Sequence, residues 1–99
     1  MILTILEAHV DGGKEAALQE AYAAVIASNT RPPGLLRSQL IRDAVDPGRW
    51  RIQTWWESRQ ALEAMRASGT PAGVLMFRAA GAEPALSIFD VISELPATR

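Results

Sequence analysis

A short turn between two alternating segments constrains the fold of this 99-residue chain more than any other feature. The turn is Asp46-Pro47-Gly48, and polar and apolar residues alternate on both sides of it, over residues 35–43 and 50–57. Alternation with a period of two is typical of a β-strand, and a short connection joins neighbouring strands in antiparallel fashion. The segment therefore predicts a β-hairpin. In its first strand, Leu36, Ser38 and Leu40 are expected on one side and Arg37, Gln39 and Ile41 on the other. One side of its second strand is expected to carry Trp50, Ile52, Thr54 and Trp56, and the other side Arg51, Gln53, Trp55 and Glu57.

Two further strands are predicted near the ends of the chain. Residues 1–10 are apolar and rich in β-branched side chains, and Asp11-Gly12-Gly13 ends this run. Residues 85–95 have the same character, and residues 96–99 are expected to form a loose tail.

A long helix is predicted between the first strand and the hairpin, over residues 14–29. Spacings of three and four place its apolar side chains on one face, and Asp11 is expected to cap its first turn. The segment Arg31-Pro32-Pro33-Gly34 ends the helix because proline cannot continue it. The apolar face consists of Leu18, Tyr22, Val25 and Ile26.

Two shorter helices are predicted after the hairpin. Ser58 is expected to cap the first, which runs to about Ser68 and turns Leu62 and Met65 inward. Thr70 is expected to cap the second, which starts at Pro71 and runs to about Ala80.

The resulting order is strand, helix, strand, strand, helix, strand, which is the split β-α-β arrangement. It predicts one α+β domain over residues 1–99, with a ferredoxin-like antiparallel sheet of four strands and all helices on one face. The other face still carries Leu3, Ile5 and Trp55. An uncovered apolar face usually has a partner, and a second copy of the chain is the commonest one. We therefore expect a homodimer.

The composition of the chain argues against several classes of protein, namely membrane-spanning, metal-binding and nucleic-acid-binding proteins. The longest apolar run is far shorter than the roughly 20 residues of a membrane helix, and the start lacks the features of a signal peptide, so a cytoplasmic protein is expected. Without cysteine and with a single histidine, the chain is not expected to hold a metal, because such sites usually need about three or four good ligands. A net charge of −1 with scattered arginines predicts no binding to nucleic acid or to a membrane surface.

Two segments resemble the antibiotic biosynthesis monooxygenase family. They are TWWES followed by RQALEAMRASGTP, residues 54–71, and PPGLLRSQLIRD, residues 32–43. The resemblance extends over nearly the whole chain and implies a dimeric α+β barrel, with two sheets packed face to face and a ligand pocket between each sheet and its helices. Members of the family include cofactor-independent oxygenases of polycyclic quinols and anthrones, heme-degrading enzymes and many proteins of unknown activity, and the shared fold does not choose among them.

Three departures from the family pattern make heme degradation the weaker expectation. Met65 stands where the family often has histidine, no histidine lies within residues 71–80, and Leu6 stands at the position of a first-strand asparagine. No cofactor is therefore expected. The leading hypothesis is a cofactor-independent monooxygenase acting on a quinol or anthrone, and the alternative is a non-catalytic dimer that binds an apolar or aromatic small molecule.

Candidate site residues follow from the expected faces and from the resemblance. Trp56 matches the family tryptophan and is a candidate for stacking on an aromatic substrate, with core packing as the alternative. Further candidates for substrate binding are Leu6, Tyr22, Thr54, Met65 and Arg78, with Asn29 as an additional one. Trp55, His9 and Ile5 are expected at the dimer interface, where Glu7 is placed to orient the His9 imidazole. No catalytic residue is assigned.

Overall fold

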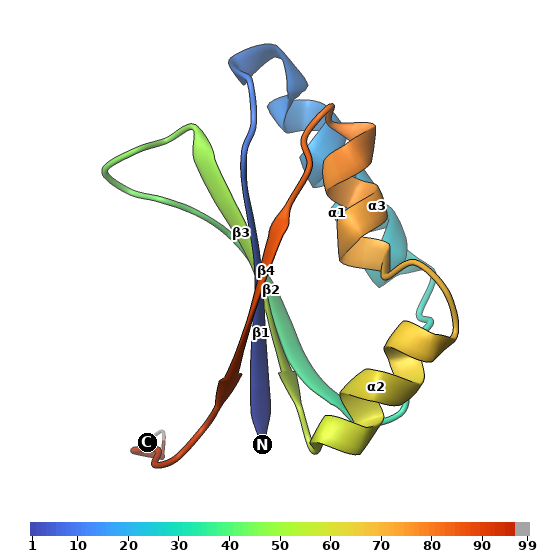
Figure 1. Cartoon of the computed structure of the whole chain (residues 1–99). Coiled ribbons are helices and arrows are strands. Elements are labelled where there is room, and N and C mark those ends of the chain that lie inside the picture. Colours follow the sequence, from blue (N-terminus) through green and yellow to red (C-terminus); the bar gives the residue numbers. More distant parts are fainter. Residues whose placement is uncertain (97–99) are drawn as a thin grey trace.

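The computed structural model of the chain describes residues 1–96, and its element order confirms the predicted α+β class (Figure 1). The strands are β1 (Ile2–His9), β2 (Leu35–Arg42), β3 (Arg49–Trp56) and β4 (Ala85–Asp90). A 3₁₀ turn, η1 (Gly12–Lys14), precedes the helices α1 (Glu15–Ala27), α2 (Arg59–Ala67) and α3 (Ala72–Ala79).

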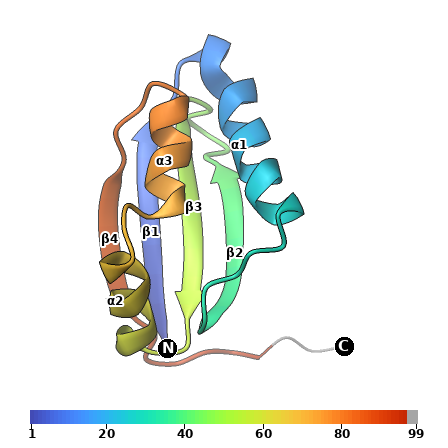
Figure 2. The same ribbon diagram turned by 90° about the vertical axis from the view of Figure 1, so that its right-hand side faces the viewer.

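The four strands form one antiparallel sheet in the order β2-β3-β1-β4. All three α-helices lie on one face of it, and the opposite face is not covered by any described helix (Figures 1 and 2). The register places Thr4 opposite Thr54 and Leu6 opposite Ile52. Because these pairs share a face, the expected alternation of β3 is confirmed, with Trp50, Ile52, Thr54 and Trp56 all buried toward the helices.

Two strand predictions need correction. The last strand ends at Asp90 rather than Leu95, because it pairs only with β1, whose first residue lies opposite Asp90. In β2, a bulge at Leu36 breaks the alternation, so Leu36 does not share the inward side of Ser38. The predicted loose tail is described only at Pro96, which is exposed, and residues 97–99 lie outside the described part of the chain.

The helix caps agree with prediction at one position of three. Ser58 caps α2 as expected, its hydroxyl accepting the Ala61 N–H at 3.1 Å. The Asp11 side chain makes no capping bond, and its backbone carbonyl accepts the Lys14 N–H instead. The cap of α3 is Pro71 rather than Thr70, since the extended Pro71 backbone turns its carbonyl toward the N–H groups of Val74 and Leu75.

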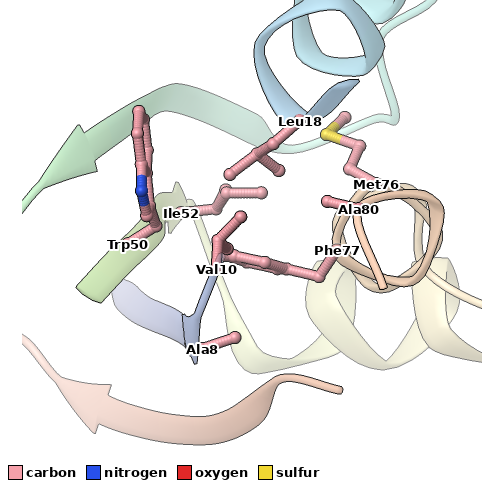
Figure 3. Close-up of a cluster of buried hydrophobic side chains, with 8 residues drawn as sticks. All are labelled: Ala8, Val10, Leu18, Trp50, Ile52, Met76, Phe77 and Ala80. Atoms are coloured by element: carbon pink, nitrogen blue, oxygen red, sulfur yellow. The ribbon is translucent and has the colours of Figure 1, made fainter. Parts of the chain in front are cut away.

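The core divides into two clusters along the sheet. The larger one joins the start of α1 to α3 and one end of the sheet (Figure 3), and we call this region the closed end. The smaller cluster joins α2 to the other end of the sheet and contains Ile2, Trp56 and Leu62. The closed end contains Ala8, Val10, Leu18, Trp50, Ile52, Met76, Phe77 and Ala80.

Candidate functional site

A cavity of about 770 Å³ lies between the two core clusters, with the sheet as its floor. Small-molecule sites commonly have volumes of about 300–1,000 Å³. Its walls come from the second half of α1, the loop that follows it, α2 and the first turn of α3. We call this region the open end, and its apolar lining includes Leu6, Val25, Ile26, Ile52, Leu62, Met65, Met76 and Leu86.

The cavity exists because α1 is packed only along its first half. Leu18 is fully buried against the closed end, whereas Ile26, two turns later on the predicted apolar face, is 66% exposed. Viewed onto the helices, α1 and α2 lie over opposite sides of the sheet, so no helix within residues 1–96 covers the second half of α1 (Figure 2). The exposed apolar side chains Val25, Ile26 and Leu86 therefore line the cavity rather than a packed core.

Three hydroxyl groups meet on the cavity wall. The Tyr22 hydroxyl donates to Ser38 Oγ at 2.9 Å, and Thr54 Oγ1 lies 3.4 Å from the same oxygen. Tyr22 comes from α1 and the other two from adjacent strands, so the cluster forms only when helix and sheet pack together. It adds hydrogen-bonding groups to a mostly apolar inner surface.

Trp56 forms part of both the cavity wall and the smaller core cluster. Its side chain is 3% exposed and packs with Ile2 and Leu62. Its indole Nε1 donates to Thr4 Oγ1 at 3.3 Å, and that hydroxyl lies 3.4 Å from the Thr54 carbonyl oxygen. The ring is therefore fixed in place, with its polar edge satisfied by the sheet.

The charged residues that line the cavity are both arginines. Arg31 donates from Nε to the Leu35 carbonyl at 3.1 Å and from Nη2 to the Leu36 carbonyl at 2.6 Å. These carbonyls belong to the bulged segment of β2. Arg66 comes from α2, and its Nη1 lies 3.5 Å from a Glu63 carboxylate oxygen. In the described part of the chain, no aspartate or glutamate lines the cavity.

Most of the predicted substrate-binding residues come together at this cavity. Leu6, Tyr22, Thr54, Met65 and Trp56 all line it, as does Asn29.

Arg78 is the exception, because it does not line the cavity. Its exposed guanidinium donates from Nε and Nη2 to the two carboxylate oxygens of Glu83, at 2.9 and 3.0 Å. This ion pair raises the pKa of Arg78 and lowers the pKa of Glu83. The contact ties α3 to the loop before β4, and we leave Arg78 out of the candidate site.

The three residues expected at an interface lie on the uncovered face of the sheet. Ile5 and Trp55 are half-buried there, and the Arg37 guanidinium lies 4.1 Å from the centre of the Trp55 ring. His9 is exposed at the edge of this face and packs over Gly48, where a side chain would collide with the imidazole.

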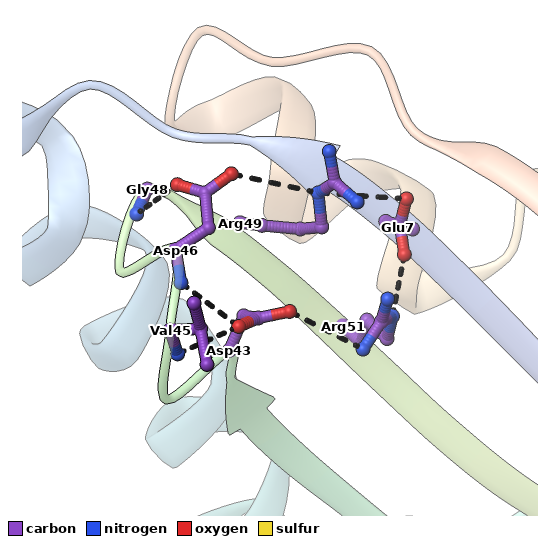
Figure 4. Close-up of polar contacts among 7 residues, drawn as sticks. All are labelled: Glu7, Asp43, Val45, Asp46, Gly48, Arg49 and Arg51. Atoms are coloured by element: carbon purple, nitrogen blue, oxygen red, sulfur yellow. Dashed lines mark hydrogen bonds and ion pairs between the residues drawn. The ribbon is translucent and has the colours of Figure 1, made fainter.

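The expected pairing of His9 with Glu7 is not found. Arg51 binds the Glu7 carboxylate directly, and Arg49 lies 3.9 Å from it (Figure 4). Glu7 is therefore engaged by arginines and does not orient the imidazole.

The turn of the hairpin adds a carboxylate to the same charged group. Asp43 accepts the N–H groups of Val45 and Asp46 at 2.8 and 2.9 Å, and Arg51 lies 3.9 Å away (Figure 4). These backbone bonds, followed by the nearby arginines, hold the pKa of Asp43 below its usual value. The group lies at the closed end, away from the cavity.

Sequence reasoning missed four functional candidates, namely Thr4, Arg31, Ser38 and Arg66. Ser38 and Thr4 are polar residues at inward positions of otherwise apolar strand faces, and that pattern was the available signal. Arg31 gave no signal, since it stands in a segment whose prolines indicate only the end of a helix.

Residues 1–96 contain neither a metal site nor a membrane-spanning helix. No group of three or more His, Asp or Glu side chains there is arranged to bind a metal ion. No helix in the same range is long and apolar enough to cross a membrane.

Comparisons with known proteins agree with this geometry. The family model described as antibiotic biosynthesis monooxygenase matches residues 1–72. No curated protein matches the chain.

Solved structures share the fold over nearly the whole chain. A protein from Deinococcus radiodurans assigned to the antibiotic biosynthesis monooxygenases superposes with a TM-score of 0.76 at 12% identity, covering 100% of both chains. SnoaB, a cofactor-independent oxygenase from Streptomyces nogalater, gives a TM-score of 0.70 at 20% identity over 97% of both chains. The heme-degrader MhuD from Mycobacterium tuberculosis, with two hemes in its active site, gives 0.72 at 25% identity, covering 97% of this chain and 100% of that one.

Proposed function

The chain belongs to the antibiotic biosynthesis monooxygenase family, and from that premise we propose that it is a small cofactor-independent oxygenase of a flat, electron-rich aromatic substrate such as an anthrone or quinol. The observation that carries the proposal is the cavity, which combines a large apolar surface with the Tyr22–Ser38–Thr54 hydroxyl cluster. The similarity to SnoaB supports the same reaction class.

In the proposed reaction, the protein positions the substrate and stabilises the negative charge that forms on it. Loss of a proton from an anthrone gives a carbanion, delocalised as a phenolate, that reduces O₂ directly. One oxygen atom becomes the new ring carbonyl, and the other leaves as water with the two hydrogens of the original CH₂ group. Trp56, whose nearly buried ring forms part of the cavity wall, would position the flat substrate, and the hydroxyl cluster would donate to the oxygen on which negative charge develops.

The alternative function is a binding protein of the same fold that does not transform its ligand. One observation favours it: in the described chain, no carboxylate or imidazole lines the cavity, so an obvious general base is missing. The proposed oxygenase would therefore rely on an acidic substrate that ionises with help from neighbouring donors.

Heme degradation is not proposed, despite the similarity to MhuD. The single histidine of the chain is His9, which lies on the uncovered sheet face and not at the cavity. A heme titration should therefore give no sharp Soret band that depends on His9.

We also propose that two copies pair through the uncovered sheet faces. This face carries the half-buried Leu3, Ile5 and Trp55 together with the exposed Phe89. Sedimentation should show a dimer at micromolar concentration, and Trp55→Ala should weaken it by about 2 kcal/mol or more, as expected for an aromatic anchor. A stable monomer would contradict the proposal.

Oxygen consumption with 1,8-dihydroxyanthrone tests the catalytic proposal. Activity should need no added metal or reductant and should survive a chelator. Trp56→Ala should lower turnover by about 100-fold, the size expected when a positioning contact is lost, while His9→Ala should have little effect.

Circular dichroism must show that the Trp56 variant remains folded, since this ring also belongs to the core. Oxidation of a substrate panel no faster than the uncatalysed background would favour the binding alternative. Loss of activity in His9→Ala would show that the wrong face of β1 has been assigned to the chemistry.

A further inference from the structure

We infer that the substrate is a carboxylated aromatic molecule, with its flat body inside the cavity and its carboxylate bound by Arg31 at the mouth. This inference rests on the proposed function and adds the substrate class. A neutral polycyclic molecule would fit the apolar walls equally well, so the charged side chains around the cavity decide between the two kinds of ligand.

The charge of the cavity lining differs from that of the whole chain. The chain has 11 acidic residues against 10 Lys and Arg. The described lining nevertheless carries two arginines, Arg31 and Arg66, and no aspartate or glutamate. An acidic ligand would meet two cations and no carboxylate among the lining residues, and a site of one sign concentrates ligands of the opposite sign.

Arg31 is held in place by neutral partners. Its bonds to the Leu35 and Leu36 carbonyls use part of its N–H donors and leave the others free. Carbonyl oxygens carry no net charge, and no carboxylate in residues 1–96 lies within ion-pairing distance of Arg31. The guanidinium therefore keeps an uncompensated charge in a fixed orientation, which lowers the entropic cost of binding a carboxylate.

Arg66 is the weaker candidate of the two. It is shared with Glu63, whose carboxylate also lies 3.8 Å from Arg59. Its side chain is free of backbone anchors among the described hydrogen bonds, so an acid would have to order it on binding. We assign the main contact to Arg31 and a secondary contribution to Arg66.

The hydroxyl cluster provides a second contact farther inside. Tyr22, Ser38 and Thr54 have one hydroxyl proton each, and the two contacts among them use two of these protons. One O–H is left to donate to a ligand oxygen. The cavity thus presents donors both on its inner wall and at its mouth, which suits a molecule with a ring oxygen and a separate carboxylate.

A matched pair of probes tests the inference without knowledge of the natural substrate. Anthracene-2-carboxylate and anthracene-2-carboxamide have nearly the same shape and differ in charge, and their binding can be followed by fluorescence titration at low salt. The wild-type protein should bind the carboxylate about tenfold more tightly than the amide, as expected for a charge-assisted contact in a partly exposed site.

Substitutions of single arginines show which residue causes the preference for the carboxylate probe. Arg31→Gln should reduce the ratio of the two affinities to near one, and Arg66→Gln should reduce it less. Arg78→Gln is the matched control, because Arg78 is an arginine away from the cavity, and it should leave the ratio unchanged. Added salt should weaken carboxylate binding by the wild type and leave amide binding unaffected, which tests the charge contribution even where Arg31→Gln does not fold.

The outcomes separate this inference from the proposed function. Equal affinity for both probes in the wild type, or a preference that persists in folded Arg31→Gln, would overturn the inference while leaving an apolar ligand site intact. Failure of both probes to bind would contradict the ligand site itself, and with it the proposed function.

Discussion

The two halves of helix α1 present apolar side chains to the same side of the molecule, yet only the first half is buried. Leu18 is fully enclosed at the closed end, whereas Ile26 is 66% exposed at the open end. At the closed end α3 lies against α1, while at the open end the nearest helix, α2, lies across the cavity (Figure 2). An apolar stripe therefore shows which face of a helix points inward, and the neighbouring helices decide whether protein or ligand covers it.

The closed end is also reinforced on the other face of the sheet. The contacts of Glu7 and Asp43 with Arg49 and Arg51, together with the turn bonds of Asp43, join the hairpin to β1 there (Figure 4). The open end depends on the smaller cluster around Trp56 and Leu62. This difference suggests that one end maintains the fold while the other can adapt to a ligand.

Truncating one apolar side chain at each end should give the largest difference in the free energy of unfolding. Leu18→Ala should lower the free energy of unfolding by about 2–5 kcal/mol, because it leaves a hole in a packed core. Ile26→Ala should change it by less than about 0.5 kcal/mol, as for other surface substitutions, but should weaken binding of an anthracene probe. Denaturant unfolding and fluorescence titration measure the two effects. Similar losses of stability in both variants would show that the second half of α1 is covered in solution.

Enlarging one small residue at each end should give a smaller difference in stability. Ala80→Val should cost about 1–3 kcal/mol, because Ala80 is enclosed at the closed end and the added volume has no space.

Gly73→Ala is the counterpart at the open end. The new methyl would lie 2.7 Å from Leu6 Cδ1, but Leu6 lines the cavity and can move into it. The gain in helix propensity, about 1 kcal/mol, should offset the strain, so stability should be nearly unchanged while the probe binds more weakly. Destabilisation of Gly73→Ala by as much as Ala80→Val would show that the two ends are equally rigid.

The smallest expected effect is an acid-dependent loosening of the closed end. The pKa of Asp43 is lowered in the folded protein, so its contribution to stability is complete above the usual value of 3.8 and is lost as the pH falls through the lower folded value. Asp43→Asn should lower stability slightly at pH 6 and reduce the further loss on going to pH 3. Asp11→Asn is the control, since the Asp11 side chain makes no capping bond. Equal acid sensitivity of Asp43→Asn and the wild type would contradict the role of this carboxylate.

The sequence by itself determined the order of the elements and the direction of most side chains. The alternation in β3 placed Ile52, Thr54 and Trp56 on one face, and the spacing in α1 turned Leu18 and Tyr22 inward. These inferences succeeded because the period of a strand or helix is a local property of the chain. They failed where the local pattern was broken, at the Leu36 bulge and at the cap of α3.

The tertiary structure alone decided how far apart the elements lie, and therefore where the cavity is. It brought Tyr22 to Ser38, fixed Arg31 on the carbonyls of β2, and left Arg78 paired with Glu83 outside the cavity. It also ended β4 at Asp90, because the pairing of β4 with β1 begins at the Ile2–Asp90 pair and only the Val91 N–H continues it, donating to the Met1 carbonyl. A repeating pattern sets the direction of a side chain relative to its own element, whereas the distance to another element depends on the packing of every side chain between them.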